Sequence, residues 1–444
     1  MGLFDAMRAR RRPVRAGVIG AGTFATMFLH QARRVPNLQV TAVADLSAER
    51  ADAALTTAGY TGTERDAVRV GTGRDGVDAV LARAGVDVVV EATGNPIAGA
   101  AHALAAIDAG QHVVMVTVEA DVLVGPVLAA RAAERGVVYS MASGDQPSLI
   151  TELVDWARTN GFDVVAAGKG TKYLPGYHES TPDTVWAHYG FTEEHAAAAG
   201  LNPVMFNSFL DGTKSAIEMA AVANATGLLP PDDGLAFPPA GADDLQDVCI
   251  PREHGGVLAR PGTVEVVSSL HRDGSPVERD LRWGVYVTLE APGAYVAGCF
   301  ANYGLRTDRS GRYTAMYRPY HLIGLELAQS VCTAGERGTD SGTPRGWLAD
   351  VVATAKRDLA PGDRLDGEGG ACLYGTVRPA AASRAAGLLP IGLTDGVAVT
   401  RQVAAGSPLT RDDVAITGGS GGTGGSGGTG NTVAHALRAE LESR

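Results

Sequence analysis

Residues 14–34 read VRAGVIGAGTFATMFLHQARR, an apolar run followed by Gly20-Ala21-Gly22 and then by a helical pattern from Thr23. With Ala25 in the third small position, the turn has the form G-x-G-x-x-A. In this motif the first glycine permits a tight turn, the second lets a pyrophosphate approach the backbone, and the third small residue allows close packing of helix on strand. The helix N-terminus supplies free N–H groups to the phosphates. The stretch therefore predicts a strand, a phosphate-binding loop and a helix.

A second predicted strand, LQVTAVAD, follows this helix and ends at Asp45, 23 residues after Gly22. That is near the usual spacing of the acidic residue that binds the ribose of a dinucleotide. A carboxylate at this position accepts hydrogen bonds from the ribose hydroxyls and repels a 2′-phosphate, so Asp45 favours NAD. Arg50 is close enough in sequence to neutralise a 2′-phosphate, which leaves NADP as the open alternative.

The alternation of strand and helix continues through VDVVVEATGN (86–95), QHVVMVTVEAD (111–121) and GVVYSMAS (136–143). Strands that alternate with helices form a parallel sheet covered on both faces, which predicts a Rossmann domain over residues 1–150. In such domains ligands bind beyond the carboxyl ends of the strands. The residues expected to bind the cofactor are Gly20, Gly22, Thr23, Phe24, Asp45, Arg50, Thr93, Gly94, Asn95 and Thr117.

Composition excludes several classes of protein. The net charge of −11 argues against a nucleic-acid partner, which would require a basic face. The sequence has no apolar run of the roughly 20 residues needed to span a bilayer, and its first residues lack the apolar core of a secretory signal. The four cysteines are far apart and show no metal-type pairing. Free thiols favour a reducing compartment, so we expect a cytoplasmic protein without membrane or nucleic-acid partners.

From about residue 150 the alternation stops. We expect an α+β domain over 151–340, with one long helix over 203–228 and strands over 263–270, 282–291 and 294–304. Helices on one face of a mainly antiparallel sheet fit a domain for substrate binding and dimerisation, so a homodimer or homotetramer is expected.

Lysine usage points to chemistry in this middle region. Only four of the 38 basic residues are lysines, and Lys169, Lys172 and Lys214 lie between 169 and 214. Arg and Lys serve almost equally as surface cations, but only a compact ammonium can lose its proton when it is desolvated. Clustering by chance, or a lysine that merely packs its stem, is the alternative. Lys356 lies outside the cluster and is expected to be an ordinary surface cation.

A reductase needs a proton for the alkoxide that forms and a cation to stabilise it. Lys172 and Lys214 are the candidates, with Asp211 or Glu119 tuning an ammonium. Asp211 and Lys214 are three residues apart, so on one helix they would share a face. Donors for a small polyhydroxy substrate are expected from Tyr173, His178, Ser180, Thr181, Thr213, Asp145 and Gln146. Oxygens for a divalent metal could come from Glu119, Asp121, Asp145 and Glu179, but no ligand spacing is evident, so a metal is left unassigned.

The last third of the sequence is rich in glycine and proline. Short strand-like runs predict a small β-rich domain over 341–416. A repeated Gly-Ser-Gly-Gly-Thr-Gly unit then predicts a flexible linker over 417–431. In a final helix over 432–444, Val433, Leu437 and Leu441 fall on one stripe, which we expect to dock on this protein or on a second copy.

Several stretches resemble the homoserine-dehydrogenase-like NAD(P)-dependent oxidoreductases that carry a C-terminal SAF (antifreeze-like) domain, whose best-known members are the 1-deoxy-D-xylulose 5-phosphate reductoisomerase-like enzymes. The matching stretches span most of residues 14–416 and read GVIGAGTF, VTVEADVLVG, SGDQPSLI, KYLPGYHESTPDTVW, FLDGTKSAIEMAAVANATGL and DGEGG with YG and LPIGL after it.

The resemblance implies a nicotinamide-dependent reductase made of a Rossmann domain, an α+β domain and a β-rich SAF-like domain. A reductoisomerase would rearrange the carbon skeleton before hydride transfer and usually needs a divalent metal. A homoserine-dehydrogenase-type reductase is an alternative, although that enzyme would carry Ala-Asn-Lys where this chain has Glu119-Ala120-Asp121. A sensor without catalytic activity, which binds a dinucleotide and reports its state, is a second alternative.

Overall fold

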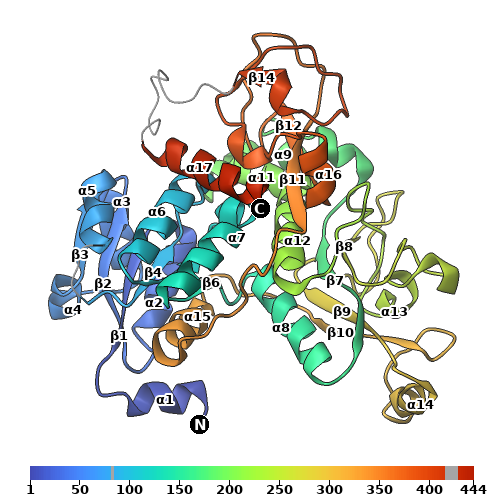
Figure 1. Ribbon diagram of the computed structural model, residues 1–444, viewed down its shortest axis with the longest axis horizontal. Coiled ribbons are helices and arrows are strands. Elements are labelled where there is room, and N and C mark those ends of the chain that lie inside the picture. The colour runs from blue at the N-terminus through green and yellow to red at the C-terminus, as the bar shows by residue number, and fades with distance from the viewer. Residues whose placement is uncertain (82–84, 416–428) are drawn as a thin grey trace. The chain divides into compact units, whose positions relative to one another are not determined.

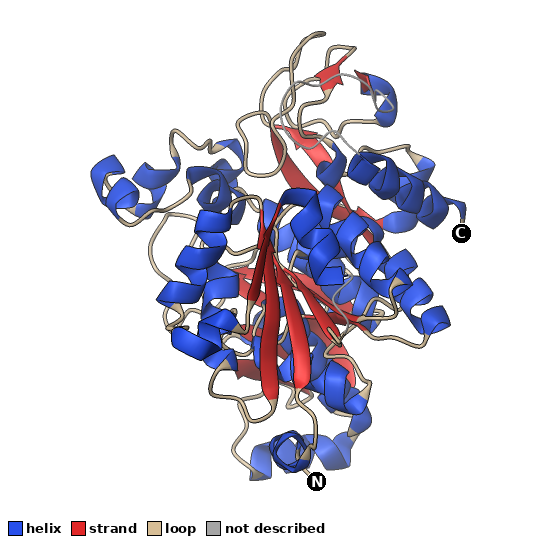
Figure 2. Cartoon of the chain, turned by 90° about the vertical axis from the view of Figure 1, so that its left-hand side faces the viewer, coloured by secondary structure: helices blue, strands red, loops and turns tan. Residues whose placement is uncertain are grey.

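The N-terminal third of the chain builds a parallel six-stranded sheet in the computed structural model, which describes residues 1–81, 85–415 and 429–444. The strand order is β3-β2-β1-β4-β5-β6. The strands are β1 (Val14–Ile19), β2 (Leu38–Asp45), β3 (Arg69–Thr72), β4 (Val88–Glu91), β5 (His112–Met115) and β6 (Tyr139–Met141). The central strands are runs of small and β-branched residues because helices cover the sheet on both sides, as Figure 2 shows.

The helices that accompany this sheet are α1 (Leu3–Ala9), α2 (Thr23–Ala32), α3 (Ala48–Thr57), α4 (Gly62–Asp66), α5 (Gly73–Leu81), α6 (Pro96–Asp108), α7 (Val118–Arg135) and the start of α8 (Gln146–Thr159). The strand order reverses between β1 and β4, which lie next to each other. In open parallel sheets such a switch point is where ligands bind.

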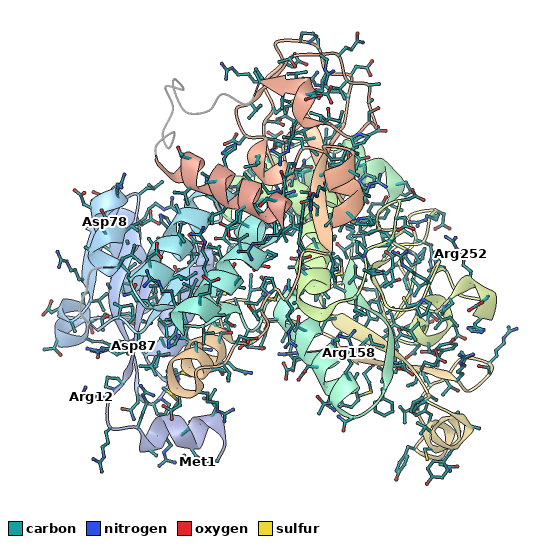
Figure 3. All side chains as sticks on the ribbon, viewed as in Figure 1. Met1, Arg12, Asp78, Asp87, Arg158 and Arg252 are labelled. Carbon is teal, nitrogen blue, oxygen red and sulfur yellow. The ribbon has the colours of Figure 1, made fainter. Side chains whose placement is uncertain are left out.

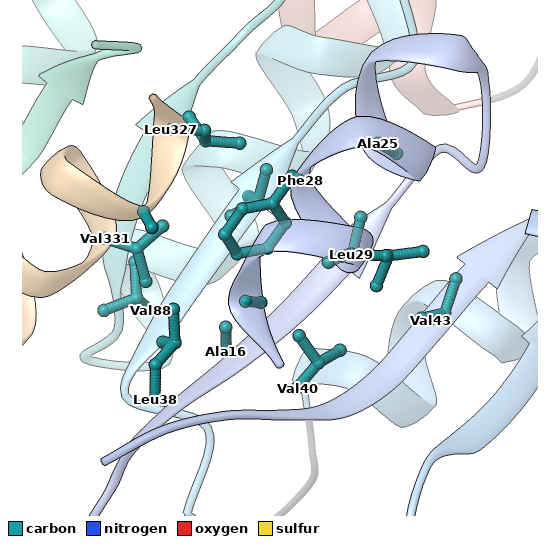
Figure 4. Packing of buried hydrophobic residues seen from close by; sticks show 14 of the residues in the cluster. Ala16, Ala25, Phe28, Leu29, Leu38, Val40, Val43, Val88, Leu327 and Val331 are labelled. Carbon is teal, nitrogen blue, oxygen red and sulfur yellow. The ribbon is translucent and has the colours of Figure 1, made fainter. Parts of the chain in front are cut away.

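The core of this first unit includes residues from far along the sequence. Phe28 and Leu29 of α2 are fully buried in the same apolar cluster as Leu327 and Val331 of α15 (Leu327–Cys332), as Figure 4 shows. A π-helical turn, η3 (Thr333–Arg337), follows α15. The first compact unit therefore consists of Met1–Leu149, Leu322–Arg345 and the C-terminal helix α17 (Thr429–Ser443). Residues 322–345 do not form a continuation of the middle domain, which was expected to extend to residue 340.

The second unit contains a mixed four-stranded sheet in the order β10-β9-β7-β8. Strand β7 (Asp163–Thr171) pairs in parallel with β8 (Thr263–Ser268) and antiparallel with β9 (Val285–Glu290), and β9 pairs antiparallel with β10 (Tyr313–Arg318). Helical elements of this part are η1 (Pro175–Glu179), α9 (Val185–Tyr189), α10 (Glu193–Ala198), α11 (Pro203–Leu210), α12 (Thr213–Thr226), α13 (Leu245–Val248), η2 (Arg252–His254) and α14 (Ala294–Asn302).

The β-rich C-terminal region belongs to the same unit, which spans residues 150–321 and 346 onward. Its elements are β11 (Ala349–Ala355), β12 (Leu373–Pro379), α16 (Ala380–Ala385), η4 (Ile391–Leu393), β13 (Ala398–Val399), η5 (Arg411–Asp413) and β14 (Val414–Ala415). Helix α12 packs against β11 and β12 and also against β7 and β8. Every residue of α12 except Lys214 is buried, as expected of a helix covered all round. The expected fold class is confirmed: a Rossmann sheet, a mixed α/β part and a small antiparallel part.

Two expected elements of the middle region are wrong. Of the strand expected over 294–304, residues Ala294–Asn302 form helix α14 instead, because β10, which follows it, takes the edge of the sheet beside β9. The single helix expected over 203–228 is two helices, broken at Asp211 and Gly212. Gly212 has a φ of +89°, a left-handed conformation that ends α11 before α12 begins.

The C-terminal helix α17 packs on α6 and α7, and Figure 1 shows the three side by side. Leu437 and Leu441 of the expected stripe are buried, as is Ala434, while Val433 is half-buried. Most of the expected linker, 417–431, lies outside the described residues, and its last three residues begin α17.

Charged side chains such as Arg12, Asp78 and Arg252 are exposed, as Figure 3 shows. The four cysteines are free. None of the helices in the described ranges combines the length and the apolar character that a membrane crossing requires.

Candidate functional site

The glycine-rich turn after β1 has the geometry that its sequence predicts. Gly20 has a φ of +95°, and a Cβ atom there would lie 2.4 Å from the carbonyl oxygen of Ala92. Only glycine fits this approach of the β1 turn to the end of β4. Gly22 caps the N-terminus of α2, and a Cβ atom there would meet nothing within 4 Å. The loop is therefore closed toward the sheet at Gly20 and open at Gly22, so its residues fit a bound pyrophosphate.

Asp45 lies at the end of β2 beside this turn. Its Oδ2 atom accepts a hydrogen bond from the amide of Ala21 at 2.8 Å, and its Oδ1 atom accepts one from the amide of Ser47 at 3.2 Å. The Nε atom of Arg50 is 3.6 Å from Oδ1. The structure thus brings Asp45, Arg50 and the glycine turn together, as expected for the ribose edge of a dinucleotide site.

A buried carboxylate that sequence reasoning missed joins the next two loops. Glu91, the last residue of β4, is completely buried. Its Oε1 atom accepts a hydrogen bond from Thr93 Oγ1 at 2.6 Å, and its Oε2 atom accepts one from Thr117 Oγ1 at 2.5 Å. His102 Nδ1 is 3.2 Å from Oε1. The amide of Gly94 in turn donates to Thr117 Oγ1 at 3.0 Å. An acid that ends an apolar strand was the one available sign of this role.

The other expected residues of this region have local roles in the structure. Asn95 caps the N-terminus of α6 by accepting from the amide of Ala98 at 2.9 Å. Thr23 is the first residue of α2, and Phe24 packs against the core beneath it. Glu119 is half-buried in the first turn of α7.

A small cavity lies at the carboxyl ends of β5 and β6. It is lined by Met115, Val118, Asp121, Met141, Ala142, Asp145, Pro147 and Ser148. The hydroxyl of Tyr139 donates to Asp121 Oδ1 at 2.9 Å, whereas Oδ2 has no hydrogen-bond partner among the described residues. Burial raises the pKa of Asp121 to about 7, and the hydrogen bond from Tyr139 opposes this shift. Gln146, also expected to bind substrate, is buried at the start of α8.

In the second unit, Asp211 is paired with a lysine that sequence reasoning had set aside. Lys356 Nζ is 2.7 Å from Asp211 Oδ2 and donates at 2.7 Å to the carbonyl oxygens of Ser180 and Gly370. The Lys356 side chain is 2% exposed. The expectation that Lys356 is a surface cation is therefore wrong, because β11 carries it into the core of the unit. Burial raises the pKa of Asp211, and Lys356 opposes that shift.

Asp211 also fixes a histidine–tyrosine pair. Its backbone carbonyl is 2.6 Å from His178 Nδ1, and His178 Nε2 is 2.9 Å from the hydroxyl of Tyr173. A carbonyl oxygen can only accept, so Nδ1 carries the proton and Nε2 accepts the hydroxyl hydrogen of Tyr173. Burial lowers the pKa of His178, which favours this neutral form. The ring of Tyr374, from β12, stacks on His178 with centroids 4.4 Å apart.

Tyr173 is supported by a second residue that the sequence did not indicate. Its ring stacks on Phe237 with centroids 3.9 Å apart. Phe237 has a φ of +49°, an uncommon conformation for a residue with a bulky side chain. Glu265 holds this turn, because its carboxylate accepts from the amides of Ala236 and Phe237 at distances of 3.1 to 3.3 Å. Burial raises the pKa of Glu265 to about 7.

The expected catalytic lysines lie in different local settings. Lys172 Nζ donates to the carbonyl of His188 at 2.5 Å and lies over the ring of Tyr189. Burial lowers its pKa, and Arg282 adds to that shift. Lys214 is half-buried at the second position of α12, so it does not share a helix with Asp211 as expected.

The remaining expected substrate residues serve local structure. Thr213 accepts at Oγ1 from the amide of Gly375 at 2.8 Å, and Ser180 donates at Oγ to Asn207 at 2.6 Å. Thr181 makes a turn with Thr184. Lys169 is buried in an ion pair with Glu218.

No metal site is evident in the part of the chain that the structure describes, since it holds no group of three or more His, Cys, Asp or Glu side chains arranged to bind an ion. Of the four acidic residues that might have supplied oxygens, Glu119, Asp121 and Asp145 belong to the first unit and Glu179 to the second.

Three protein-family models match the chain. Residues 14–119 match "Oxidoreductase family, NAD-binding Rossmann fold", residues 144–327 match "Oxidoreductase DRL, catalytic domain", and residues 350–415 match "SAF domain". These descriptions agree with the expected order of a dinucleotide-binding domain, a catalytic domain and an SAF domain. None of them names a homoserine dehydrogenase or a reductoisomerase. No curated protein sequence matches the chain significantly.

Several solved structures are similar to parts of the chain. GenD2 from gentamicin A biosynthesis, in complex with NAD, is 21% identical over 40% of this chain and 51% of that chain, with a TM-score of 0.27. Biliverdin reductase from Synechocystis sp. PCC 6803, with biliverdin and NADP+, is 24% identical over 36% and 48%, with a TM-score of 0.27. UDP-N-acetylglucosamine 3-dehydrogenase GnnA from Acidithiobacillus ferrooxidans gives the same four values. The chain spans about half the length of these proteins.

Proposed function

We propose that this NAD(P)-dependent oxidoreductase acts on the carbonyl or alcohol carbon of a small polyhydroxy molecule, with or without a phosphate group. The nicotinamide cofactor supplies or accepts the hydride when it is bound. The proposed dinucleotide-binding loops belong to the first unit, and the polar side chains proposed for the substrate belong to the second. A 1-deoxy-D-xylulose 5-phosphate reductoisomerase-like reaction is the narrower form of this proposal.

The hydrogen-bonded pair of Tyr173 and His178 is the observation that carries the proposal. With Nδ1 of His178 fixed on the carbonyl of Asp211, Nε2 is free to take a proton from the Tyr173 hydroxyl. During alcohol oxidation, Tyr173 would accept the proton of the substrate hydroxyl while its own proton moves to Nε2. During carbonyl reduction both transfers are reversed: Tyr173 would give its proton to the alkoxide and take one from Nε2 of His178.

Lys172 and Lys214 are proposed as the cations that stabilise the alkoxide. The lowered pKa of Lys172 supports this role, because a partly desolvated ammonium interacts strongly with a developing negative charge. Neither Asp211 nor Glu119 is assigned a proton-transfer step. Asp211 positions His178 through its carbonyl, and its carboxylate is neutralised by Lys356.

For the cofactor, we propose NAD as the preferred form, with NADP as the alternative. The carboxylate of Asp45 lies against the glycine turn and supports a ribose with free hydroxyls. Arg50 is exposed beside it and could pair with a 2′-phosphate. A homodimer or homotetramer is proposed for the assembly. It is supported by the edge strand β10, where Met316 and Tyr317 are exposed, and light scattering would test it.

The test is to follow cofactor absorbance at 340 nm with a panel of small ketoses, aldoses and their phosphates, and with an amino-acid semialdehyde for the homoserine-dehydrogenase-type alternative. Tyr173→Phe should lower kcat by roughly 100-fold or more on the accepted substrate, the scale of general acid–base catalysis. Tyr177→Phe is the matched control, since Tyr177 is a buried tyrosine of the same loop that contacts His188. Turnover of the semialdehyde alone would overturn the substrate class, and equal rates for both variants would overturn the role of Tyr173.

A further inference from the structure

We propose that Glu91 is a positioning residue that holds the loops after β4 and β5 in the conformation that binds the dinucleotide. The inference rests on the dinucleotide-binding role of the first unit and is independent of the substrate. Three features support it: the hydrogen bonds of Glu91, the burial of its carboxylate and the position of its hydrogen-bond partners in loops at the carboxyl ends of β4 and β5.

Each oxygen of Glu91 serves a different loop. Thr93, in the loop after β4, donates to Oε1, and Thr117, in the loop after β5, donates to Oε2. Each threonine hydroxyl also accepts a hydrogen bond from a backbone amide. Asn95 N–H donates to Thr93 Oγ1 at 3.3 Å, and Gly94 N–H donates to Thr117 Oγ1 at 3.0 Å. The bond from Gly94 to Thr117 crosses from one loop to the other. One carboxylate therefore fixes two loops and the backbone between them.

Helix α6 packs over the carboxylate of Glu91, and a glycine of this helix leaves the space that the carboxylate occupies. A Cβ atom on Gly99 of α6 would lie 3.1 Å from Glu91 Oε2 and 3.0 Å from the Cβ atom of Ala120. Glycine at this position lets α6 approach both the carboxylate and α7. His102, also on α6, provides the third contact at Oε1. A carboxyl group without solvent exposure needs such partners, because an unpaired buried charge is strongly unfavourable.

The partners of Glu91 lead toward the edge where a ligand is expected. Strand β4 lies next to β1 at the switch point of the sheet, and Gly20 at the end of β1 approaches Ala92 closely. Gly94 has a φ of +69°, and a Cβ atom there would meet nothing within 4 Å, so its backbone is open to an approaching molecule. Glu91 itself is covered, so it acts through the loops without touching the ligand.

The experiment compares variants that remove one hydrogen bond at a time. Thr117→Val removes the hydroxyl at nearly constant volume, whereas Thr117→Ser keeps it. Glu91→Gln replaces one acceptor oxygen by an NH₂ donor. The single remaining oxygen cannot keep the hydrogen bonds to Thr93, Thr117 and His102 together. Asp87→Asn is the matched control. Asp87 precedes the same strand at its opposite end and accepts from the amide of Arg15 at 2.8 Å; Figure 3 labels it.

The readout is the dissociation constant of the reduced cofactor, measured by fluorescence titration without substrate, together with the melting temperature. We expect Glu91→Gln and Thr117→Val to weaken binding roughly 10-fold or more, the scale of one lost hydrogen bond to a charged group. Thr117→Ser should restore binding to within about 3-fold of the unmodified chain, and Asp87→Asn should leave it unchanged.

Equal affinity for all four variants would overturn the proposal, even if melting temperatures fall, because Glu91 would then be a purely structural residue. The proposal would also be overturned if Thr117→Ser weakened cofactor binding as much as Thr117→Val, because the hydroxyl group would then have no effect on binding. If Glu91→Gln does not fold, the Thr117 pair decides alone. A chain that binds cofactor as expected but reduces none of the polyhydroxy compounds would refute the proposed substrate class and leave the role of Glu91 standing.

Discussion

Glu91 in the first unit and Asp211 in the second are both completely buried carboxylates, but they are stabilised in different ways. Glu91 is held by two hydroxyls and an imidazole, and the hydroxyls pass the interaction on to loop amides. Asp211 faces an ammonium, Lys356, whose other two hydrogen bonds go to backbone carbonyls. The first arrangement shapes loops at an open edge, whereas the second joins segments within a core.

The contrast separates two uses of a buried acid. Hydroxyl groups carry no charge, so a substitution in the network around Glu91 can remove one hydrogen bond at a time and disturb only the local backbone. An ion pair cannot be weakened one bond at a time, because removing either partner leaves an uncompensated charge in the protein interior. Variants in the second network should therefore affect stability first, and variants in the first should affect ligand binding first.

The largest effect should come from Lys356→Met. It leaves the carboxylate of Asp211 buried without its cation, which typically costs about 3–5 kcal/mol of unfolding free energy. Lys172→Met removes a half-buried lysine that donates to one backbone carbonyl and lies over the ring of Tyr189, and it should cost about 1 kcal/mol. Urea denaturation would measure both values. Similar losses for the two variants would mean that the Lys356–Asp211 pair adds no special stability.

The next effect separates the two glycines of the turn after β1. Gly20→Ala places a methyl group against the carbonyl of Ala92 at a φ of +95°, so it should destabilise the fold by about 1–3 kcal/mol. Gly22→Ala has room and an ordinary φ of −77°, so stability should change by less than about 0.5 kcal/mol. Gly22→Ala should nevertheless weaken dinucleotide binding roughly 100-fold by blocking the approach of the pyrophosphate. Titration and thermal unfolding measure the two effects, and unchanged affinity in Gly22→Ala would contradict the assignment of this loop.

A smaller effect concerns pH. In the unfolded chain Asp121 has a pKa near 3.9, and in the folded chain it has a pKa of about 7. Between these values the folded protein holds a proton that the unfolded chain releases, so raising the pH favours unfolding. From pH 5.5 to 7 this group should remove on the order of 2 kcal/mol of stability. The difference in unfolding free energy between the chain and Asp121→Asn, measured at both pH values, should narrow or reverse by that amount; a constant difference would place the titration elsewhere.

The smallest effect concerns the ribose edge. Asp45→Ser removes the carboxylate that repels a 2′-phosphate, and Arg50 loses its ion pair with that carboxylate. The preference should therefore shift toward NADP by about 10-fold, or 1.4 kcal/mol. The measurement is the ratio of the dissociation constants for NAD and NADP. The loss of the hydrogen bond from the Ala21 amide weakens the binding of both cofactors alike, so it does not change this ratio. Arg50→Gln in the Asp45→Ser background should reverse the shift. A ratio that does not move would show that Asp45 does not face the ribose.

The first unit could be predicted closely from the sequence because its rules are local. A glycine turn between a strand and a helix determines its own geometry, and the following strand then brings Asp45 beside it. Glu91 escaped prediction because its partners come from two other loops and a helix. A single acid after VVV does not reveal which side chains the fold will bring to it.

The second unit could be predicted only in outline, because its contacts join distant segments. Lys356 lies 145 residues from Asp211 in sequence, so the clustering of the other lysines favoured Lys172 and Lys214 instead. The break between α11 and α12 depends on Gly212, which read as a tolerated glycine within a long helical pattern. Propensity also favoured a strand over 294–304, where tertiary context selected a helix.

The return of α15 to the first unit has a consequence for how the protein is made. Leu327 and Val331 belong to the cluster that holds Phe28, so the Rossmann core lacks part of its apolar filling when residue 149 is synthesised. About 180 residues must still be added, which takes roughly 10–40 s at ordinary rates of translation. During that time the apolar face beneath α2 is exposed on the ribosome, and it becomes a ready target for chaperones until α15 arrives.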